Sequence, residues 1–305
     1  MISFRYHVVS IVAVFLALAL GVLLGTTVVN QGVIENLSQR TNDAVRRSEQ
    51  LRAQVGDLQE GLRTWDRFGA AVEPILISGQ LTATEVVVVT QEGVDAGEVD
   101  GVRQTLADAG ASVVAVLVVT NRMALVDADA RTDLQAVLGG AASANDSVAL
   151  SEEAAQQVAA RLANGPAGGT VDLLRQLVDA RFLVVRGGTG TIEEIGGSGQ
   201  ALSILAGGTQ DPIVPPESFL APLTVALAES ARPVVAAETQ ETAYPFVPIL
   251  RRNGSLDDEV VTVDNADTMP GRIAVVLGLR DLIREPGRGG HFGVKGGASA
   301  LIPQP

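Results

Sequence analysis

The sequence predicts an α/β protein: an N-terminal transmembrane helix and a coiled-coil stalk, followed by a largely parallel, Rossmann-like α/β domain. Three observations support this architecture. The run Val8–Val29 contains no charged side chain. Apolar residues then recur at alternating spacings of three and four from Ile34 to Trp65. After Phe68, continuous β-branched runs alternate with helical patterns, which is typical of a parallel sheet with helical crossovers.

The apolar run lies in residues 1–29, which we predict to be a membrane anchor. At about 1.5 Å per helical residue, it covers roughly the 30 Å hydrocarbon core of a bilayer. A cleaved signal peptide is the alternative, because Arg5 precedes the run and Ala17-Leu18-Ala19 resembles a cleavage site. The run continues well past Ala19, whereas signal cores usually have about 7–15 residues. We therefore favour an uncleaved anchor. Arginines on both sides of the run leave its orientation open.

Residues 30–68 are predicted to form a coiled-coil stalk that pairs with a second copy of the chain. Four heptads run without a break from Ile34, and eight of the ten a and d positions are apolar. We expect the dimerisation residues to be the apolar a and d residues Ile34, Leu37, Ala44, Leu51, Val55, Leu58, Leu62 and Trp65.

The stalk also has features that oppose pairing. In a parallel dimer, Arg47 at a g position faces Arg52 at an e position of the second copy, and these like charges repel. Gly56 and Gly61 each cost about 1 kcal/mol of helix stability relative to alanine. Weak pairing, or packing of this helix on its own domain, is therefore the alternative to a dimeric stalk.

Residues 69–286 are predicted to form one α/β domain, with a possible internal boundary near 139–147. Buried-strand patterns occupy six segments, which are Thr82–Thr90, Ala111–Thr120, Arg181–Arg186, Pro233–Glu238, Asp258–Val263 and Arg272–Leu279. Helical patterns occupy five segments, which are Asp95–Ala109, Asp129–Leu138, Glu152–Ala163, Val171–Ala180 and Glu217–Ala231. Residues 287–305 are glycine-rich, and we predict a flexible tail there.

The composition narrows the function classes. The net charge is −13, and the first 68 residues carry almost balanced charges, so the negative charge lies on the α/β domain. An acidic domain opposes binding to nucleic acid or to an anionic lipid surface. There is no cysteine, which excludes disulfides, thiolate metal sites and a cysteine nucleophile.

A glycine-rich stretch, Gly187-Gly188-Thr189-Gly190-Thr191, follows a predicted strand at a place where an α/β protein can hold a phosphate. It lacks the third glycine of the dinucleotide fingerprint, and no Gly-Lys-Ser/Thr follows. A plain turn is therefore the favoured interpretation, and a nucleotide-binding enzyme is the weaker hypothesis. We predict no catalytic and no cofactor-binding residues.

Metal-ligating residues are sparse and scattered. Glu193 and Glu194, and the group Asp257, Asp258 and Glu259, lack the spacing of calcium loops and are interpreted as solvated turns. Histidine occurs only at positions 7 and 291, and methionine only at 1, 123 and 269. Soft copper sites use clustered Cys, Met or His side chains. A tight copper site within one chain is therefore not expected, and the metal ligands, if any, are unknown.

Two blocks of residues stand out, one at each end of the chain. The N-terminal block comprises Met1-Ile2-Ser3, Arg5, His7-Val8-Val9-Ser10, Ala13-Val14-Phe15-Leu16-Ala17-Leu18-Ala19, Gly21-Val22 and Gly25. The C-terminal block comprises Pro270-Gly271-Arg272-Ile273, Asp281-Leu282-Ile283 and Gly290-His291-Phe292-Gly293. Both blocks resemble the actinobacterial MctB family, described as copper transport proteins of the cell envelope, which usually carries Gly-His-Tyr-Gly at the last of these motifs. The middle of the chain matches only in pattern.

The resemblance implies a single-pass membrane protein of the cell envelope, with its body on the outer side and a link to copper transport or copper tolerance. Other relatives act in cell division as envelope partners joined through the coiled coil. One membrane helix cannot enclose a pore by itself. We therefore expect a non-enzymatic, membrane-anchored homodimer of the MctB type. The alternative is a scaffold that transports nothing and recruits partners in division or envelope assembly.

Overall fold

The computed structural model describes residues 4–140, 143–168, 171–208 and 214–304, with the side chains of residues 26–35 excepted. The chain divides into two units, residues 1–66 and 67–305. The first unit is helical throughout its described part, because it belongs to the 74-residue helix α1 (Phe4–Ile77). The last turns of α1, residues 67–77, belong to the second unit, which we call the body.

The body contains one seven-stranded sheet in the order β3-β2-β1-β4-β5-β6-β7. All neighbouring strands are parallel except β2 and β3, which are antiparallel. The strands are β1 (Glu85–Gln91), β2 (Ser112–Val119), β3 (Leu183–Arg186), β4 (Gln200–Gly208), β5 (Val234–Thr242), β6 (Val260–Val263) and β7 (Gly290–Phe292). The predicted α/β fold with a largely parallel sheet is confirmed.

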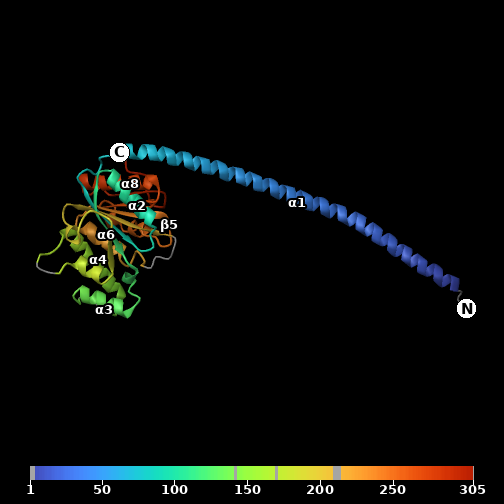
Figure 1. Ribbon diagram of the computed structural model, residues 1–305, viewed down its shortest axis with the longest axis horizontal. Coiled ribbons are helices and arrows are strands. Elements are labelled where there is room, and N and C mark those ends of the chain that lie inside the picture. The colour runs from blue at the N-terminus through green and yellow to red at the C-terminus, as the bar shows by residue number, and fades with distance from the viewer. Residues whose placement is uncertain (1–3, 141–142, 169–170, 209–213, 305) are drawn as a thin grey trace. The chain divides into compact units, whose positions relative to one another are not determined.

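Helices cover both faces of this sheet (Figure 1). One face packs against α3 (Ala128–Val137), α4 (Ser147–Asn164), α5 (Leu173–Asp179) and α6 (Leu220–Glu229). The other packs against α2 (Ala96–Asp108), α8 (Met269–Arg284) and the end of α1. Strand β1 carries apolar side chains on both faces, so both faces need to be covered. Val87 and Val89 point to the first face, and Val86 and Val88 point to the second. Shorter helical segments are η1 (Asn121–Ala124), η2 (Ile192–Glu194), α7 (Val247–Leu250) and η3 (Gly254–Leu256).

One sequence prediction for the body is wrong, and one strand has no counterpart among the predictions. Arg272–Leu279, predicted as a strand, lies inside α8, which Thr268 caps by accepting a hydrogen bond from the amide of Gly271. A short apolar run buried on all sides has no periodicity that separates strand from helix. Strand β4 was not predicted, although its residues Gln200–Gly207 are all buried.

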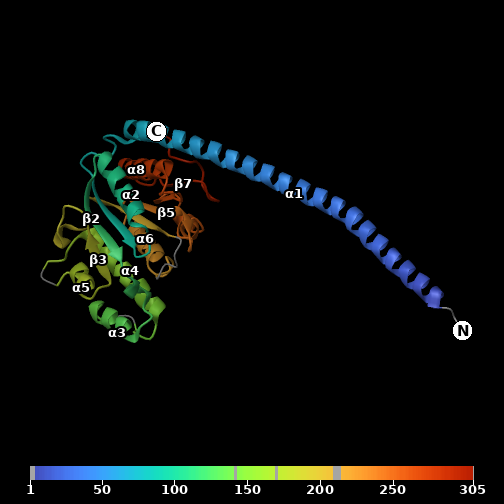
Figure 2. The ribbon, with the colours of Figure 1, turned by 45° about the vertical axis from the view of Figure 1, so that its right-hand side comes forward.

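Residues 287–305, for which the sequence predicts a flexible tail, include a strand and a set of backbone hydrogen bonds. Residues 290–292 form strand β7 beside β6, and α8 lies next to this part of the chain (Figure 2). Beyond β7, the amide of Gly293 donates to the carbonyl of Ala300, and the amide of Ser299 donates to that of His291. We call residues 290–300 the C-terminal strap. The backbone of the strap therefore pairs with β6 and with itself.

Candidate functional site

The N-terminal part of α1 has the length and composition of a membrane span. Residues Phe4–Gly25 have a mean hydropathy of 2.8, and none of the searched window is buried. Twenty-two helical residues extend about 33 Å, which matches the hydrocarbon core of a bilayer. This segment is a membrane anchor or a signal sequence.

The predicted dimerisation residues follow further along α1, and several of them are large apolar side chains that the helix leaves exposed. Exposed fractions are 64% for Leu37, 60% for Leu51, 69% for Leu58 and 63% for Leu62. Val55, Trp65 and Ala44 are exposed as well, whereas the side chain of Ile34 lies outside the described residues. We call these a and d positions the stalk seam.

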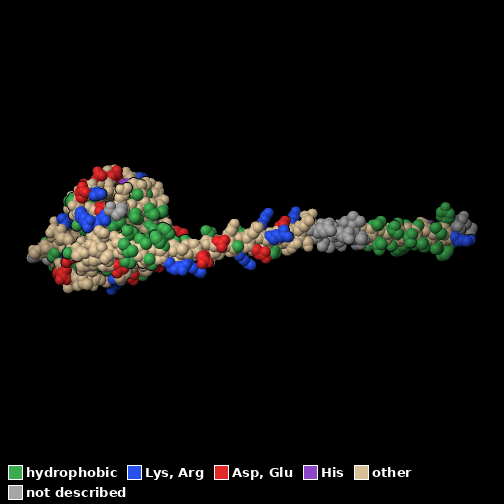
Figure 3. All heavy atoms as spheres, turned by 90° about the horizontal axis from the view of Figure 1, so that it is seen from above, with side chains coloured by type: hydrophobic (Ala, Val, Ile, Leu, Met, Phe, Trp, Pro, Cys, Tyr) green, Lys and Arg blue, Asp and Glu red, His purple; other side chains and the backbone are tan. Residues whose placement is uncertain are grey.

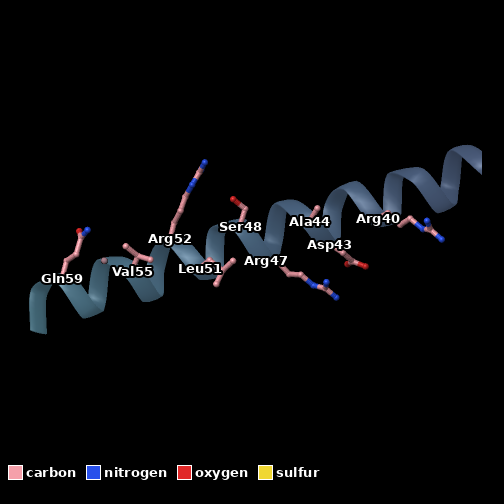
Figure 4. Close-up of a pocket in the computed structure, with 10 residues that line it drawn as sticks. Arg40, Asp43, Ala44, Arg47, Ser48, Leu51, Arg52, Val55 and Gln59 are labelled. Atoms are coloured by element: carbon pink, nitrogen blue, oxygen red, sulfur yellow. The ribbon is translucent and has the colours of Figure 1, made fainter. Parts of the chain in front are cut away.

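Charged side chains flank the stalk seam. Figure 4 shows Ala44, Leu51 and Val55 on the helix together with Arg40, Asp43, Arg47 and Arg52. Blue and red side chains alternate along this part of the helix, in contrast to the apolar section near the N-terminus (Figure 3). An apolar stripe between charged flanks is the pattern that helices use to pair in water.

The body contains a buried polar cluster beneath the C-terminal strap. The fully buried carboxylate of Asp264, just after β6, accepts hydrogen bonds from the strap amides of Val294 (2.7 Å) and Lys295 (3.1 Å). It also pairs with the Nη1 of Arg251 at 2.7 Å. Gly293 is required here, because a Cβ at this position would lie 2.1 Å from Oδ1 of Asp264. The cluster therefore fastens the strap to the sheet.

A second buried carboxylate holds the same strap. Glu238 on β5 accepts hydrogen bonds from the amides of Phe246 (2.7 Å) and Val247 (3.0 Å), and its other oxygen pairs with the Nζ of Lys295 at 2.8 Å. Lys295 also donates to the carbonyl of Thr239. Both oxygens of the Glu238 carboxylate therefore bond to groups of the protein itself, and the cluster has a structural role.

His291, the only histidine of the body, lies on β7. Its Nδ1 is 2.9 Å from Oγ1 of Thr262, and its Nε2 is 3.1 Å from Oδ1 of Asp257. Thr262 is fully buried, so its hydroxyl has no access to a substrate. Within the described parts of the chain, no group of three or more His, Asp or Glu side chains is placed to hold a metal ion.

In the glycine-rich loop predicted as a turn, most of the amides are bonded within the protein itself. The amides of Thr189 and Gly190 donate to the carbonyls of Val113 and Val114 on β2. A Cβ on Gly188 would lie 2.1 Å from the carbonyl oxygen of Val114, so glycine is needed for close packing. Since β3 runs antiparallel, the loop follows β2 toward its amino end, away from the edge where α/β proteins bind nucleotides.

At the switch point between β1 and β4, where such folds bind phosphates, this chain places carboxylates. Asp95 caps α2, and Glu98, Glu241 and Asp267 line the same pocket. Burial raises the pKa of Glu98, and the charges of Asp267 and Asp95 raise it further. The negative charge of these carboxylates repels a phosphate. The sequence did not predict this acidic pocket, because its residues come from separate segments of the chain.

The comparisons with known proteins cover the whole chain. The family described as "Copper transport outer membrane protein, MctB" matches residues 1–303. The protein named copper transporter MctB of Mycobacterium tuberculosis (strain ATCC 25618 / H37Rv) is 29% identical over 320 residues, 99% of each chain. Its namesake in Mycobacterium leprae (strain TN) is 28% identical over 324 residues, 100% of each chain. The terminal blocks and the full-length match agree, and the chain belongs to the MctB family.

Proposed function

We propose that this chain is a membrane-anchored envelope protein that serves copper transport or copper homeostasis. The observation that carries the proposal is the family match over residues 1–303, together with relatives named copper transporters that align over their full length. The apolar helix Phe4–Gly25 is long enough to serve as the anchor. In this proposal the helix is not cleaved, and the body stands on the outer side of the cytoplasmic membrane, as the family resemblance implies.

The physical arrangement favours a role in which the anchored chain acts as part of an assembly. Of the described helices, one is long and apolar enough to cross a membrane, and a single helix does not enclose a pore. The exposed stalk seam supports pairing with a second copy through Leu51 and Leu58. Anchoring restricts two copies to a plane, which raises their effective concentration and helps a marginal stalk to pair.

Copper tolerance tests this proposal. A deletion strain should be more sensitive to copper than its parent, and the native gene should restore tolerance. Leu51→Glu places a charge in the stalk seam and should fail to restore it. Ala53→Glu adds the same charge at an f position opposite the seam, and should restore it. Normal copper tolerance in the deletion strain contradicts the copper role.

The orientation of the body has its own test, which uses the absence of cysteine from the chain. Val126 is 80% exposed on the body, so a single cysteine in the variant Val126→Cys is accessible to a thiol reagent. A membrane-impermeant maleimide should label this variant in intact cells as fully as in permeabilised cells. Labelling only after permeabilisation places the body in the cytoplasm and overturns the proposed orientation.

A scaffold for division or envelope assembly is the second candidate. It is favoured by the exposed stalk seam, which offers a helix-binding surface without any transported substrate. Crosslinking in native membranes followed by purification of the chain should then return a division or cell-wall protein. Recovery of the chain alone contradicts this candidate and leaves the copper test unaffected.

A further inference from the structure

A pocket in the body lies between α2 and the strands β1, β2 and β3. Its volume is about 330 Å³, which is at the small end of the range for small-molecule sites. Its apolar lining comes from Ala96 and from four valines, Val94, Val99, Val116 and Val118. An apolar wall of this kind excludes water from one side of a ligand and leaves specificity to the few polar groups around it.

Thr90 supplies an unpartnered polar group in this wall. It is the residue after Val89 on β1, and strand alternation points it to the same face of the sheet as Val86 and Val88, where α2 lies. Thr90 is 2% exposed, and its Oγ1 has no hydrogen-bond partner. A buried hydroxyl without a partner is unfavourable, so a bound group that accepts its proton is stabilised.

Two arginines provide positive charge at the same pocket. Arg186 ends β3 on the face to which Val184 also points, and within the described chain its guanidinium has no hydrogen bond or ion pair. Arg103 on α2 is paired with Asp100 at 3.1 Å. The other carboxylate of the lining, Glu92, accepts the amide of Asn121 at 2.7 Å. Of the two arginines, Arg186 is therefore the one whose guanidinium has no carboxylate partner among the described residues.

We infer that this pocket binds a small monocarboxylate with an apolar body. The carboxylate pairs with the guanidinium of Arg186, which offers a fork of donors suited to two carboxylate oxygens. The apolar body packs against the valines, and a carbonyl or hydroxyl oxygen on it accepts the hydrogen bond of Thr90. The site is separate from the stalk seam and from the C-terminal strap, so it is independent of the proposed function.

Calorimetric titration of the full chain in lipid nanodiscs tests the inference, with empty nanodiscs correcting for partition into lipid. Three probes separate the contributions of the carboxylate and the ketone to the binding affinity. Benzoylpropionate carries both groups, phenylbutyrate lacks the ketone, and benzoylpropionamide lacks the charge. Saturable binding should be tightest for benzoylpropionate, with a Kd roughly tenfold lower than that of the amide. The Kd of phenylbutyrate should be roughly threefold higher than that of benzoylpropionate.

Two variants and a control link these preferences to residues. Arg186→Gln should remove the preference for the acid over the amide. Thr90→Val should remove the preference for the ketone and should also raise the melting temperature of the unliganded chain, because an unpaired buried hydroxyl is lost. Arg284→Gln removes an exposed arginine of α8 outside the pocket and should change no Kd. No saturable binding of benzoylpropionate, or preferences that survive both variants, overturns the inference.

Discussion

Asp264 should be the residue on which attachment of the C-terminal strap depends most. Its buried carboxylate faces three donors, namely the amides of Val294 and Lys295 and the guanidinium of Arg251. In Asp264→Asn the volume is kept, but an amide nitrogen replaces one oxygen and meets a donor rather than an acceptor. Removing one partner of a buried ion pair costs about 3–5 kcal/mol, which is a large share of the stability of a domain.

Urea unfolding of the full chain and hydrogen exchange of the strap measure this loss. At about 2–3 kcal/mol per M, the unfolding midpoint of the body should fall by about 1–2 M, and the strap amides should exchange faster. The matched control is Asp257→Asn, because Asp257 is 56% exposed and bonds His291 in the same strap. It should cost less than about 1 kcal/mol. Equal midpoints for the two variants would refute the reasoning.

Three further predictions concern the body and the stalk. Because burial and nearby carboxylates raise the pKa of Glu98 above its usual 4.5, the folded body binds that proton more tightly than the unfolded chain does. The native body therefore loses stability as the pH rises past 4.5 and Glu98 becomes charged, whereas Glu98→Gln has no such loss. Calorimetry should show that the melting temperature of Glu98→Gln, relative to that of the native chain, increases from pH 4 to pH 7. Gly188→Ala should lower the free energy of unfolding by about 2–4 kcal/mol, because the added methyl group clashes with β2. Gly139→Ala is also at positive φ but has open space around it, so denaturant titrations should show a smaller loss of about 1–2 kcal/mol. Gly56→Ala, at an open helical position outside the stalk seam, should stabilise the stalk by about 1 kcal/mol, seen as a higher melting temperature of the helical signal.

The central strands could be predicted because local chemistry decides them. Val86–Val89 and Val113–Val119 are β-branched or apolar throughout, as a strand buried on both faces requires. Strand β4 escaped prediction because Ser203, which is fully buried, and its terminal glycines dilute that signal. The segment Arg272–Leu279 is equally apolar, but its cap at Thr268 and its packing make it a helix.

The strap and its polar cluster could not be predicted, because their partners are far apart in the sequence. Glu238 and Lys295 are separated by 57 positions, and Asp264 and Val294 by 30. A high glycine content suggests flexibility, yet Gly293 is present because the backbone approaches a buried carboxylate closely. The stalk seam, by contrast, follows from periodicity alone, and its pairing stays a prediction.

Cysteine crosslinking in native membranes tests the paired stalk most directly, since the chain has no cysteine of its own. Leu58→Cys places a thiol at a d position of the stalk seam, and Asp57→Cys places one at the neighbouring c position. Oxidation should convert Leu58→Cys to a covalent dimer and leave Asp57→Cys largely monomeric. Equal crosslinking of both variants, or none of either, would contradict a stalk that pairs through this seam.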